Sequence, residues 1–300
     1  MTFAILQLLL VQLILPAVFI FSLWKASFQN KLEWMIQALF TVVFIFWVYS
    51  SGRWDWVSYY LRFVWLILLV AAVYRSWKNV RPLPFRTPFS RKQKWSIGLY
   101  VVLALVFGLY NVWTFSGYTT DNQAIELEFP LKSGVYYIGQ GGNHVQINYH
   151  NAYPKQKYAL DIVELNKWGL RAAGLYPSEL EKYVIFGDQV YSPCSGKIMD
   201  AEKQLLDLIP PDTNSEQPGG NHVIISCEKQ NAKVFIAHMQ ENSVMAKEGD
   251  TIQKGEPIGL VGNSGNTSEP HLHIHAVRDG KGVPITFDGK FLVRNSLVWE

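Results

Sequence analysis

The sequence predicts an α+β chain in which a bundle of about four transmembrane helices precedes a β-rich domain. Long apolar runs are concentrated in the first 116 residues, whereas all seven histidines and both cysteines lie after residue 143. The 300 residues are 49% hydrophobic and only 17% charged, a composition that points to membrane contact. We therefore expect a helical membrane domain over residues 1–116, a linker over 117–134 and an extracytoplasmic domain over 135–300. The net charge of +3 is too small to indicate a nucleic-acid partner.

Four apolar runs are long enough to span a lipid bilayer, which takes about 20 residues. They cover Phe3–Trp24, Trp34–Gly52, Trp56–Tyr74 and Trp95–Phe115. Trp and Tyr gather at their ends, where aromatic rings anchor helices at the membrane interface. Arg62, near one end of the third run, has a side chain long enough to reach the headgroups. The first run could instead be a cleaved signal peptide, but it lacks a basic start and an evident small-residue cleavage site.

The placement of Lys and Arg predicts the orientation of these spans. The segment Arg75–Lys94 contains seven basic residues and no acidic one, so it should stay in the cytoplasm. Counting spans from it, the Lys25–Lys31 loop is also cytoplasmic, whereas the N-terminus, the Arg53–Asp55 loop and everything after Ser116 lie outside. Lipid or nucleic-acid binding is another interpretation of the basic segment. We expect a multi-pass protein of the inner or plasma membrane whose C-terminal domain faces the extracytoplasmic, periplasmic side.

After Ser116 the pattern changes to short apolar runs separated by Gly, Pro and Asn turns. Examples are "YALDIVEL", "NHVIISCEK" and "AKVFIAHM", which are strand signals at short spacing. Cys194 and Cys227 lie on such predicted strands, where they could form a disulfide or remain two buried thiols. The glycines of "GLVGNSGN", at positions 259, 262 and 265, predict a tight hairpin that leads into the next strand.

That next strand carries histidines at every second position, His271, His273 and His275, in "EPHLHIHAVR". Alternate residues of a strand share one face, so the three imidazoles should point the same way. Neutral imidazole nitrogen is a good zinc ligand, and burying such a row without partners would be costly. The other interpretation is a solvated polar face.

Two residues upstream complete a His/Asp set of the sort that hydrolytic zinc sites use. His238 ends the apolar strand "VFIAHM", and Asp161 lies within "YALDI". A catalytic zinc takes about three protein ligands and leaves one position open for water. Taken alone, each of these two residues could equally be structural.

The run from "VFIAHM" through "GDTIQKGEPIGLVGNSGNTSEP" to "HLHIHAV" resembles the core of the lysostaphin-type (LytM-like) zinc endopeptidases, which cut peptide bonds in bacterial peptidoglycan. "YALDI" is similar to the segment with the family's Asp ligand, and "DQVYSPCSGKI" to the one before its central strands. The resemblance covers roughly residues 135–285 and leaves the membrane half out. It implies an all-β domain of the duplicated hybrid motif type with an antiparallel sheet, Zn²⁺ as cofactor and a peptidoglycan peptide as substrate.

Carried over position by position, the resemblance implies that Asp161 and His273 bind zinc. It implies that His238 and His271 are catalytic, flanking the reacting water and stabilising the oxyanion. Asn263, Ser264 and Asn266 in the glycine-rich segment are candidates for substrate binding.

The sequence departs from the family's pattern at the first zinc ligand, which in the family is often a histidine four residues before the Asp. This chain has Lys157 there, and a strand over 157–161 would aim its ammonium at the metal. We expect His150, in "NYHNAYPKQKYALDI", to be the third ligand. His144, His275 or no third protein ligand are the alternatives. His275 also departs from the family, which usually has Glu at that position, and Glu269 stands where the family often has Gly.

Together these features predict a membrane-anchored zinc endopeptidase that acts on peptidoglycan outside the cytoplasm. The alternative is a catalytically inactive LytM-like module that binds cell wall or regulates another hydrolase, which Lys157 favours. The joint presence of Asp161, His238, His271 and His273 argues against that alternative. A membrane sensor is a third interpretation, and the pattern identifies no protein partner.

Overall fold

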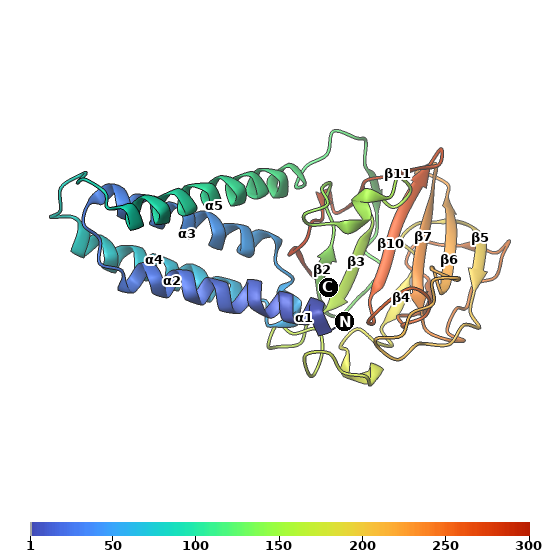
Figure 1. Cartoon of the computed structure of the whole chain (residues 1–300). Coiled ribbons are helices and arrows are strands. Elements are labelled where there is room, and N and C mark those ends of the chain that lie inside the picture. Colours follow the sequence, from blue (N-terminus) through green and yellow to red (C-terminus); the bar gives the residue numbers. More distant parts are fainter. Residues whose placement is uncertain (1) are drawn as a thin grey trace. The chain divides into compact units, whose positions relative to one another are not determined.

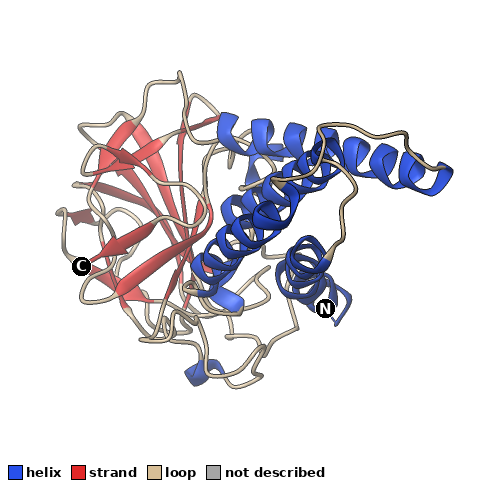
Figure 2. Cartoon of the chain, turned by 90° about the vertical axis from the view of Figure 1, so that its left-hand side faces the viewer, coloured by secondary structure: helices blue, strands red, loops and turns tan. Residues whose placement is uncertain are grey.

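The computed structural model describes residues 2–300, which divide into two compact units. The first holds the chain up to Trp54 together with Tyr60–Phe115, and the second holds Asp55–Tyr59 and Ser116–Glu300. The short segment Asp55–Tyr59 therefore counts with the second unit, although it lies between two helices in the sequence. One unit is helical and the other is built on an antiparallel sheet, which confirms the predicted α+β class (Figures 1 and 2).

The first unit consists of four helical segments, each long and apolar enough to cross a membrane. They are α1 (Thr2–Leu9), which continues through a π-helical turn (Leu10–Ile14) into α2 (Leu15–Lys25), then α3 (Lys31–Ser51), α4 (Leu61–Val80) and α5 (Arg91–Ser116). The third span begins at Leu61 and not at Trp56, because Trp54–Trp56 form a short 3-10 helix. The Arg62 side chain does not extend outward, although it is long enough to do so. It is buried, and its guanidinium lies 3.9 Å from the centre of the Tyr49 ring.

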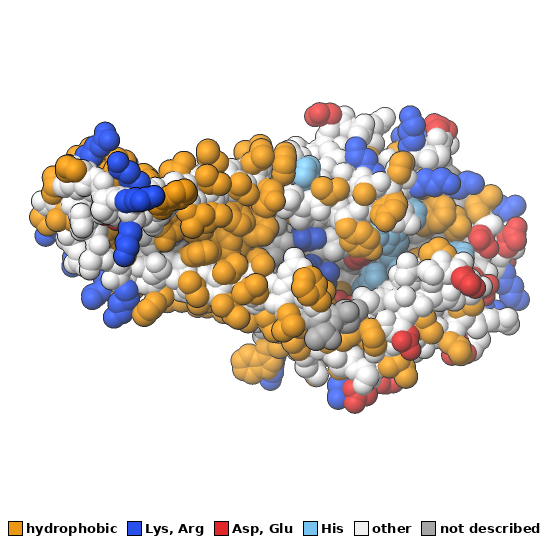
Figure 3. All heavy atoms as spheres, in the orientation of Figure 1, with side chains coloured by type: hydrophobic (Ala, Val, Ile, Leu, Met, Phe, Trp, Pro, Cys, Tyr) orange, Lys and Arg blue, Asp and Glu red, His pale blue; other side chains and the backbone are white. Residues whose placement is uncertain are grey.

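The connection before α3 and the connection before α5 lie together at one end of the helical unit. The backbone amide of Lys31 donates to the Pro84 carbonyl at 3.0 Å, and Asn30 Nδ2 donates to Thr87 Oγ1 at 2.9 Å. Lys and Arg side chains gather at this end, while apolar side chains cover the helices (Figure 3). Two basic connections at one end agree with both facing the same aqueous compartment.

A nine-stranded antiparallel sheet organises the second unit. Its strands are β2 (Val135–Gln140), β3 (Leu160–Glu164), β5 (Gly196–Glu202), β6 (Asn221–Cys227), β7 (Ala232–Met239), β8 (Thr251–Ile252), β10 (Leu272–Arg278), β11 (Lys281–Val283) and β14 (Leu297–Trp299). Their order is β14–β2–β3–β10–β7–β6–β5–β8, with β11 paired to β10. Smaller sheets join β1 (Ile125–Leu127) to β12 (Ile285–Phe287) and β13 (Lys290–Phe291), and β4 (Gln189–Tyr191) to β9 (Pro257–Leu260).

The strand β10 lies between β3 and β7, which come from distant parts of the sequence (Figure 1). Its residue His273 is opposite Asp161 on β3 and opposite Ala237 on β7. This register brings segments more than a hundred residues apart to the same point of the sheet. It is the fold's contribution to the site described below.

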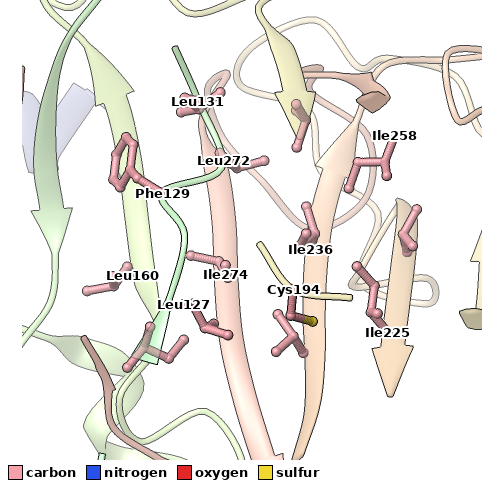
Figure 4. Packing of buried hydrophobic residues seen from close by; sticks show 14 of the residues in the cluster. Leu127, Phe129, Leu131, Leu160, Cys194, Ile225, Ile236, Ile258, Leu272 and Ile274 are labelled. Atoms are coloured by element: carbon pink, nitrogen blue, oxygen red, sulfur yellow. The ribbon is translucent and has the colours of Figure 1, made fainter. Parts of the chain in front are cut away.

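One face of β10 packs into the apolar core. Leu272 and Ile274 have no exposed surface and lie beside Ile236 of β7 (Figure 4). Burial of each such side chain stabilises the fold by about 1.5–3 kcal/mol. A slip of one residue would exchange the two faces of the strand, so this packing fixes the register and leaves His273 and His275 on the opposite face.

Cys194 and Cys227 form a disulfide with a Cα–Cα distance of 5.8 Å, so the disulfide interpretation holds and the interpretation as two buried thiols does not. The bond joins the residue two before β5 to the last residue of β6, and both cysteines are buried in the core. It closes a loop with a sequence separation of 33 residues.

Replacing both cysteines with Ala is expected to lower the free energy of unfolding of the second unit by about 3–4 kcal/mol, because the open loop regains conformational entropy in the unfolded state. Denaturant unfolding of the full chain in detergent, followed by near-UV circular dichroism, measures this. Reductant should destabilise the native chain and leave the double variant unaffected. An unfolding midpoint that is the same in the two proteins would contradict the prediction.

The hairpin expected at the glycine-rich segment is not present. Strand β9 pairs with β4 and not with β10, so residues 261–271 form a loop that ends at His271. The loop is tied elsewhere: Gly262 N–H donates to the His238 carbonyl at 3.0 Å, and Asn263 N–H donates to Asp207 Oδ1 at 2.6 Å.

Candidate metal centre

His150 reaches the sheet from a short 3-10 helix, Tyr149–Ala152. The buried Asn148 side chain accepts from the His150 backbone amide at 3.2 Å and donates to the Ala159 carbonyl at 3.1 Å, which ties this turn to the start of β3. His150 Nε2 consequently lies 2.9 Å from Asp161 Oδ1. Its Nδ1 faces Gln156 Oε1 at 3.2 Å, a carbonyl-type oxygen that accepts a hydrogen bond. Nδ1–H therefore donates to Gln156, and Nε2 is the ring atom that faces the centre. Burial alone would lower the pKa of His150, but the Asp161 carboxylate outweighs it and raises that pKa.

His273 approaches the same carboxylate from the neighbouring strand. Its Nδ1 lies 3.0 Å from Asp161 Oδ1. The ligand atoms of His150, Asp161 and His273 all lie within 4.8 Å of one another, and the three residues are 4%, 8% and 4% exposed. Two imidazole nitrogens and one carboxylate oxygen this close together match the donor set of a catalytic zinc site. If Asp161 and His273 both bind one metal ion, as the sequence predicts, they must lie close together, and in the structure they do.

His275 lies behind His273 and does not belong to this ligand group. Its Nδ1 is 2.9 Å from His273 Nε2, and its ring stacks on Phe235 with the centroids 4.6 Å apart. Burial, with a further contribution from His273, lowers the pKa of His275 to about 2, so the imidazole is neutral. When Nδ1 of His273 acts as a ligand, its Nε2–H donates to His275, which is the supporting contact that metal-bound histidines generally make.

Lys157 does not point at the centre as expected. The strand begins only at Leu160, so the expectation that residues 157 and 161 share a strand face fails. The Lys157 ammonium lies 5.2 Å from the centre of the Tyr158 ring. His144, another alternative for the third ligand, accepts at Nδ1 from the Gln146 backbone amide at 3.2 Å, and it belongs to neither of the possible ligand groups found among residues 2–300.

His238 faces the centre because β7 is irregular at its end. Ile236 packs into the core and Ala237 faces the groove, so regular alternation would turn His238 into the core. The backbone of His238 has φ 64°, in the left-handed region, and the pairing with β6 shifts register there. As a result Met239 occupies the core and His238 lines the groove, where its Nδ1–H donates to the Ser264 carbonyl at 2.9 Å.

His271 precedes β10 and completes the cluster. Its Nδ1–H donates to the Glu269 carbonyl at 2.9 Å, with Thr267 Oγ1 a further 3.1 Å contact. The opposite nitrogen, Nε2, lies 3.6 Å from Asp161 Oδ1. His238 and His271 have their ring centroids 4.9 Å apart. Both histidines thus have Nδ1 engaged by a backbone carbonyl and Nε2 available to accept a proton.

The structure also contains a second possible ligand group, made of His238, His271 and His273. It shares His273 with the first group but lacks a carboxylate. The group with Asp161 supplies an anionic oxygen that compensates the charge of a divalent cation, so we regard it as the better candidate.

The charges at the centre are unevenly distributed. Burial alone would raise the pKa of the Asp161 carboxyl, but His150 and His271 outweigh it and hold that pKa well below its usual range. Burial, followed by His271 and His273, holds the pKa of His238 well below its usual range as well. At neutral pH the centre therefore combines a carboxylate with a neutral His238.

The cluster lies in an open groove of about 1480 Å³ (Figure 3, where histidines are pale blue). Asn266, one of the three candidates for substrate binding, lines this groove. Asn263 and Ser264 have no exposed surface: Asn263 Nδ2 donates to the Leu208 carbonyl at 2.6 Å, and Ser264 Oγ donates to the Met239 carbonyl at 2.7 Å. These two side chains hold the loop in place and cannot touch a substrate in this arrangement.

Reasoning from the sequence missed the supporting residues Gln156, Asn148 and Thr267. Each makes a hydrogen bond to a candidate site residue or to its backbone. Their types are common in turns, so the sequence contains no signal that would have distinguished them.

The Gln156→Leu variant is expected to weaken metal binding about 10- to 100-fold, because His150 would lose the acceptor that orients its ring. Competition with a fluorescent zinc chelator, using the full chain in detergent, measures the change. Gln156→Glu retains an acceptor oxygen and is the matched control, which should bind nearly as tightly as the native chain. Equal affinity of the Leu and Glu variants would exclude this supporting role.

Residues 183–285, about a third of the chain, match the model of Peptidase family M23, which confirms the resemblance found in the sequence. The matched region contains His238, His271 and His273, whereas His150 and Asp161 precede it. A relative is the peptidoglycan DD-endopeptidase ShyA of Vibrio cholerae, 29% identical over 72 residues. These residues make up 24% of this chain and 16% of ShyA.

Similar solved structures include a zinc-containing peptidase from Vibrio cholerae, with 20% identity and a TM-score of 0.33, covering 54% of this chain and 39% of that one. The catalytic domain of lysostaphin from Staphylococcus simulans is also 20% identical, with a TM-score of 0.24, covering 40% of this chain and 81% of that domain. The chain therefore spans less than half the length of either Vibrio cholerae protein.

Proposed function

We propose that this protein is a membrane-anchored zinc endopeptidase that hydrolyses peptide bonds of peptidoglycan outside the cytoplasm. One observation carries the proposal: ligand atoms of His150, Asp161 and His273 lie within 4.8 Å of one another in an open groove, with His238 and His271 beside them. The match to Peptidase family M23 and the name of the relative ShyA support the reaction class and the substrate.

In this proposal His150 Nε2, Asp161 Oδ1 and His273 Nδ1 hold the zinc. The donor set fits Zn²⁺, since two imidazole nitrogens and one carboxylate oxygen are the ligands of many catalytic zinc sites and would leave one coordination position for water or substrate. Zn²⁺ bound there would polarise the scissile carbonyl and lower the pKa of water toward about 7.

The remaining chemistry belongs to His238 and His271. Each donates Nδ1–H to a backbone carbonyl and therefore, in its neutral form, presents an unprotonated Nε2. One of these nitrogens accepts a proton from the attacking water, and the resulting imidazolium returns it to the leaving amine. Because the Ser264 and Glu269 carbonyls fix the two rings, the histidines need no rotation between these steps.

The groove suits a polymer better than a small molecule, because it is open and has a volume of about 1480 Å³. Tyr149 and Tyr153 at one side are half exposed, and Lys233 and Arg278 add positive charge farther along it. Asn266 contributes an amide that can bond a peptide backbone. We assign the groove to an extended peptide of the cell wall.

The helical unit serves as the anchor in this proposal. Its four helices have the length and composition to cross a bilayer, and the basic connections at one end favour a cytoplasmic location for that end. The chain leaves α5 at the other end, so the second unit faces the cell wall.

Digestion of isolated peptidoglycan by the full chain in detergent tests the proposal. We expect new amino groups to be released and the release to stop with a chelator and resume with added zinc. Retention on peptidoglycan without any cleavage would overturn the enzyme assignment and support the inactive LytM-like alternative.

A further inference from the structure

The segment Asp55–Tyr59 follows α3 in the chain. Two side chains, those of Arg171 and Tyr176, connect it to the loop that precedes His271. The Trp56 indole stacks on the Tyr176 ring, with centroids 5.6 Å apart and planes inclined by only 10°. The Arg171 guanidinium lies 3.7 Å from the centre of the Trp56 ring, within the range of a cation–π contact. The Trp56 indole therefore contacts two side chains, Tyr176 and Arg171, and each of these also contacts the loop before His271.

Arg171 is the first intermediary. It is 1% exposed, and its Nε and Nη2 both lie 2.6 Å from Glu269 Oε2. On its other side Asp55 Oδ2 is 3.9 Å from Nε, and the Arg171 backbone amide donates to the Asp55 carbonyl at 3.1 Å. A buried guanidinium requires carboxylate partners of this kind. Arg171 therefore fixes the positions of Asp55 and Glu269 relative to each other.

Tyr176 is the second intermediary. Its hydroxyl donates to the Ser268 carbonyl at 2.6 Å. The two partners of Trp56 thus hold consecutive residues of the loop, Ser268 through its backbone and Glu269 through its carboxylate. The carbonyl of Glu269 in turn accepts the Nδ1–H of His271 at 2.9 Å.

We infer that Trp56 and Arg171 are positioning residues for His271, acting through the carboxylate of Glu269. The inference rests on the proposed function, in which His271 accepts a proton at Nε2. Fixing the Glu269 peptide fixes the Nδ1–H bond and hence the direction of Nε2. It also gives Glu269, which replaces the glycine often found in the family, a physical role. The catalytic loop is then held by a segment that joins two membrane-spanning helices in the sequence.

The test uses Glu269→Ala and Trp56→Ala, with Glu269→Gln and Trp56→Phe as conservative rescues. Glu269→Gln keeps an acceptor oxygen, and it leaves Arg171 facing the Asp55 carboxylate. Glu179→Ala, which removes an exposed ion pair with Lys182, is the matched control. The full chain is studied in detergent, because a fragment that starts after α5 would lack Asp55 and Trp56.

The first readout is kinetic. Cleavage of purified peptidoglycan should show kcat lowered about 10- to 100-fold in the two Ala variants, with KM and zinc content unchanged and activity largely restored in the rescues. A loss of zinc, or a rise in KM at constant kcat, would contradict a role through His271.

The second readout does not depend on activity. Amide hydrogen exchange in residues 266–271 should speed up at least about tenfold in both Ala variants, while residues 232–239 of β7 stay as protected as in the native chain. Unchanged exchange in that loop would overturn the inference even if the enzyme assignment stands. Faster exchange in the loop of a chain that cleaves nothing would retain the positioning contact and reject the proposed function.

Discussion

The His150→Ala variant is expected to lose most of its bound zinc and, with it, hydrolysis of peptidoglycan. His150 supplies one of three ligand atoms, and its Nε2 lies 2.9 Å from Asp161 Oδ1. Loss of a partner that merely supports a ligand costs about 10- to 100-fold in affinity, and loss of the ligand itself should cost more. Equilibrium dialysis against buffered zinc, followed by metal analysis of the full chain, gives the affinity.

Lys157→Ala is the matched control for this prediction. It lies between the 3-10 helix that carries His150 and β3, and its ammonium is placed over the Tyr158 ring. The control variant should keep both its zinc and its activity. If His150→Ala binds zinc as tightly as Lys157→Ala, then His150 is not the substitute ligand, and the group formed by His238, His271 and His273 becomes the better candidate.

The His271→Ala variant is expected to keep its zinc and to lose activity about 10²- to 10⁴-fold, the usual contribution of a positioned general acid or base. Its Nε2 is 3.6 Å from Asp161 Oδ1, close enough to reach a water molecule at the metal, and it is not one of the three ligands proposed. Single-turnover digestion of a soluble peptidoglycan fragment, with zinc content measured on the same sample, separates the two properties.

His144→Ala provides the control for His271→Ala, because His144 lies outside both ligand groups found in residues 2–300. It should leave zinc and activity unchanged. Loss of zinc from His271→Ala would mean that this histidine is a ligand and that the division of roles between the histidines is different from the one proposed here.

The sequence predicted those features that follow from local periodicity. The alternation in "EPHLHIHAVR" predicted that its histidines share one face of a strand, and His273 and His275 do so, with Leu272 and Ile274 buried in the core on the other face. The four apolar runs appear as helices for the same reason, since length and composition suffice to predict them. The predicted proximity of Asp161 and His273 is present, because the resemblance fixed which strands are neighbours.

Features that depend on irregular backbone or on long-range contacts could not be predicted in this way. The left-handed φ of His238 reverses the face of the last residues of β7, and nothing in "VFIAHM" signals it. The expected hairpin failed because Asn263 bonds to the distant residues Asp207 and Leu208. The contact of Arg171 with Glu269 spans 98 residues, and each of these residues looks like an ordinary surface charge in the sequence.

The measurement that tests the central claim most directly is the metal content and metal coordination of the full chain, purified in detergent and equilibrated with micromolar zinc. We expect about one zinc per chain, with X-ray absorption showing only nitrogen and oxygen neighbours at about 2.0–2.2 Å and no sulfur at about 2.3 Å. Asp161→Asn together with His273→Ala should abolish that signal. A native chain that remains metal-free under these conditions would contradict the proposed centre and the hydrolase built on it.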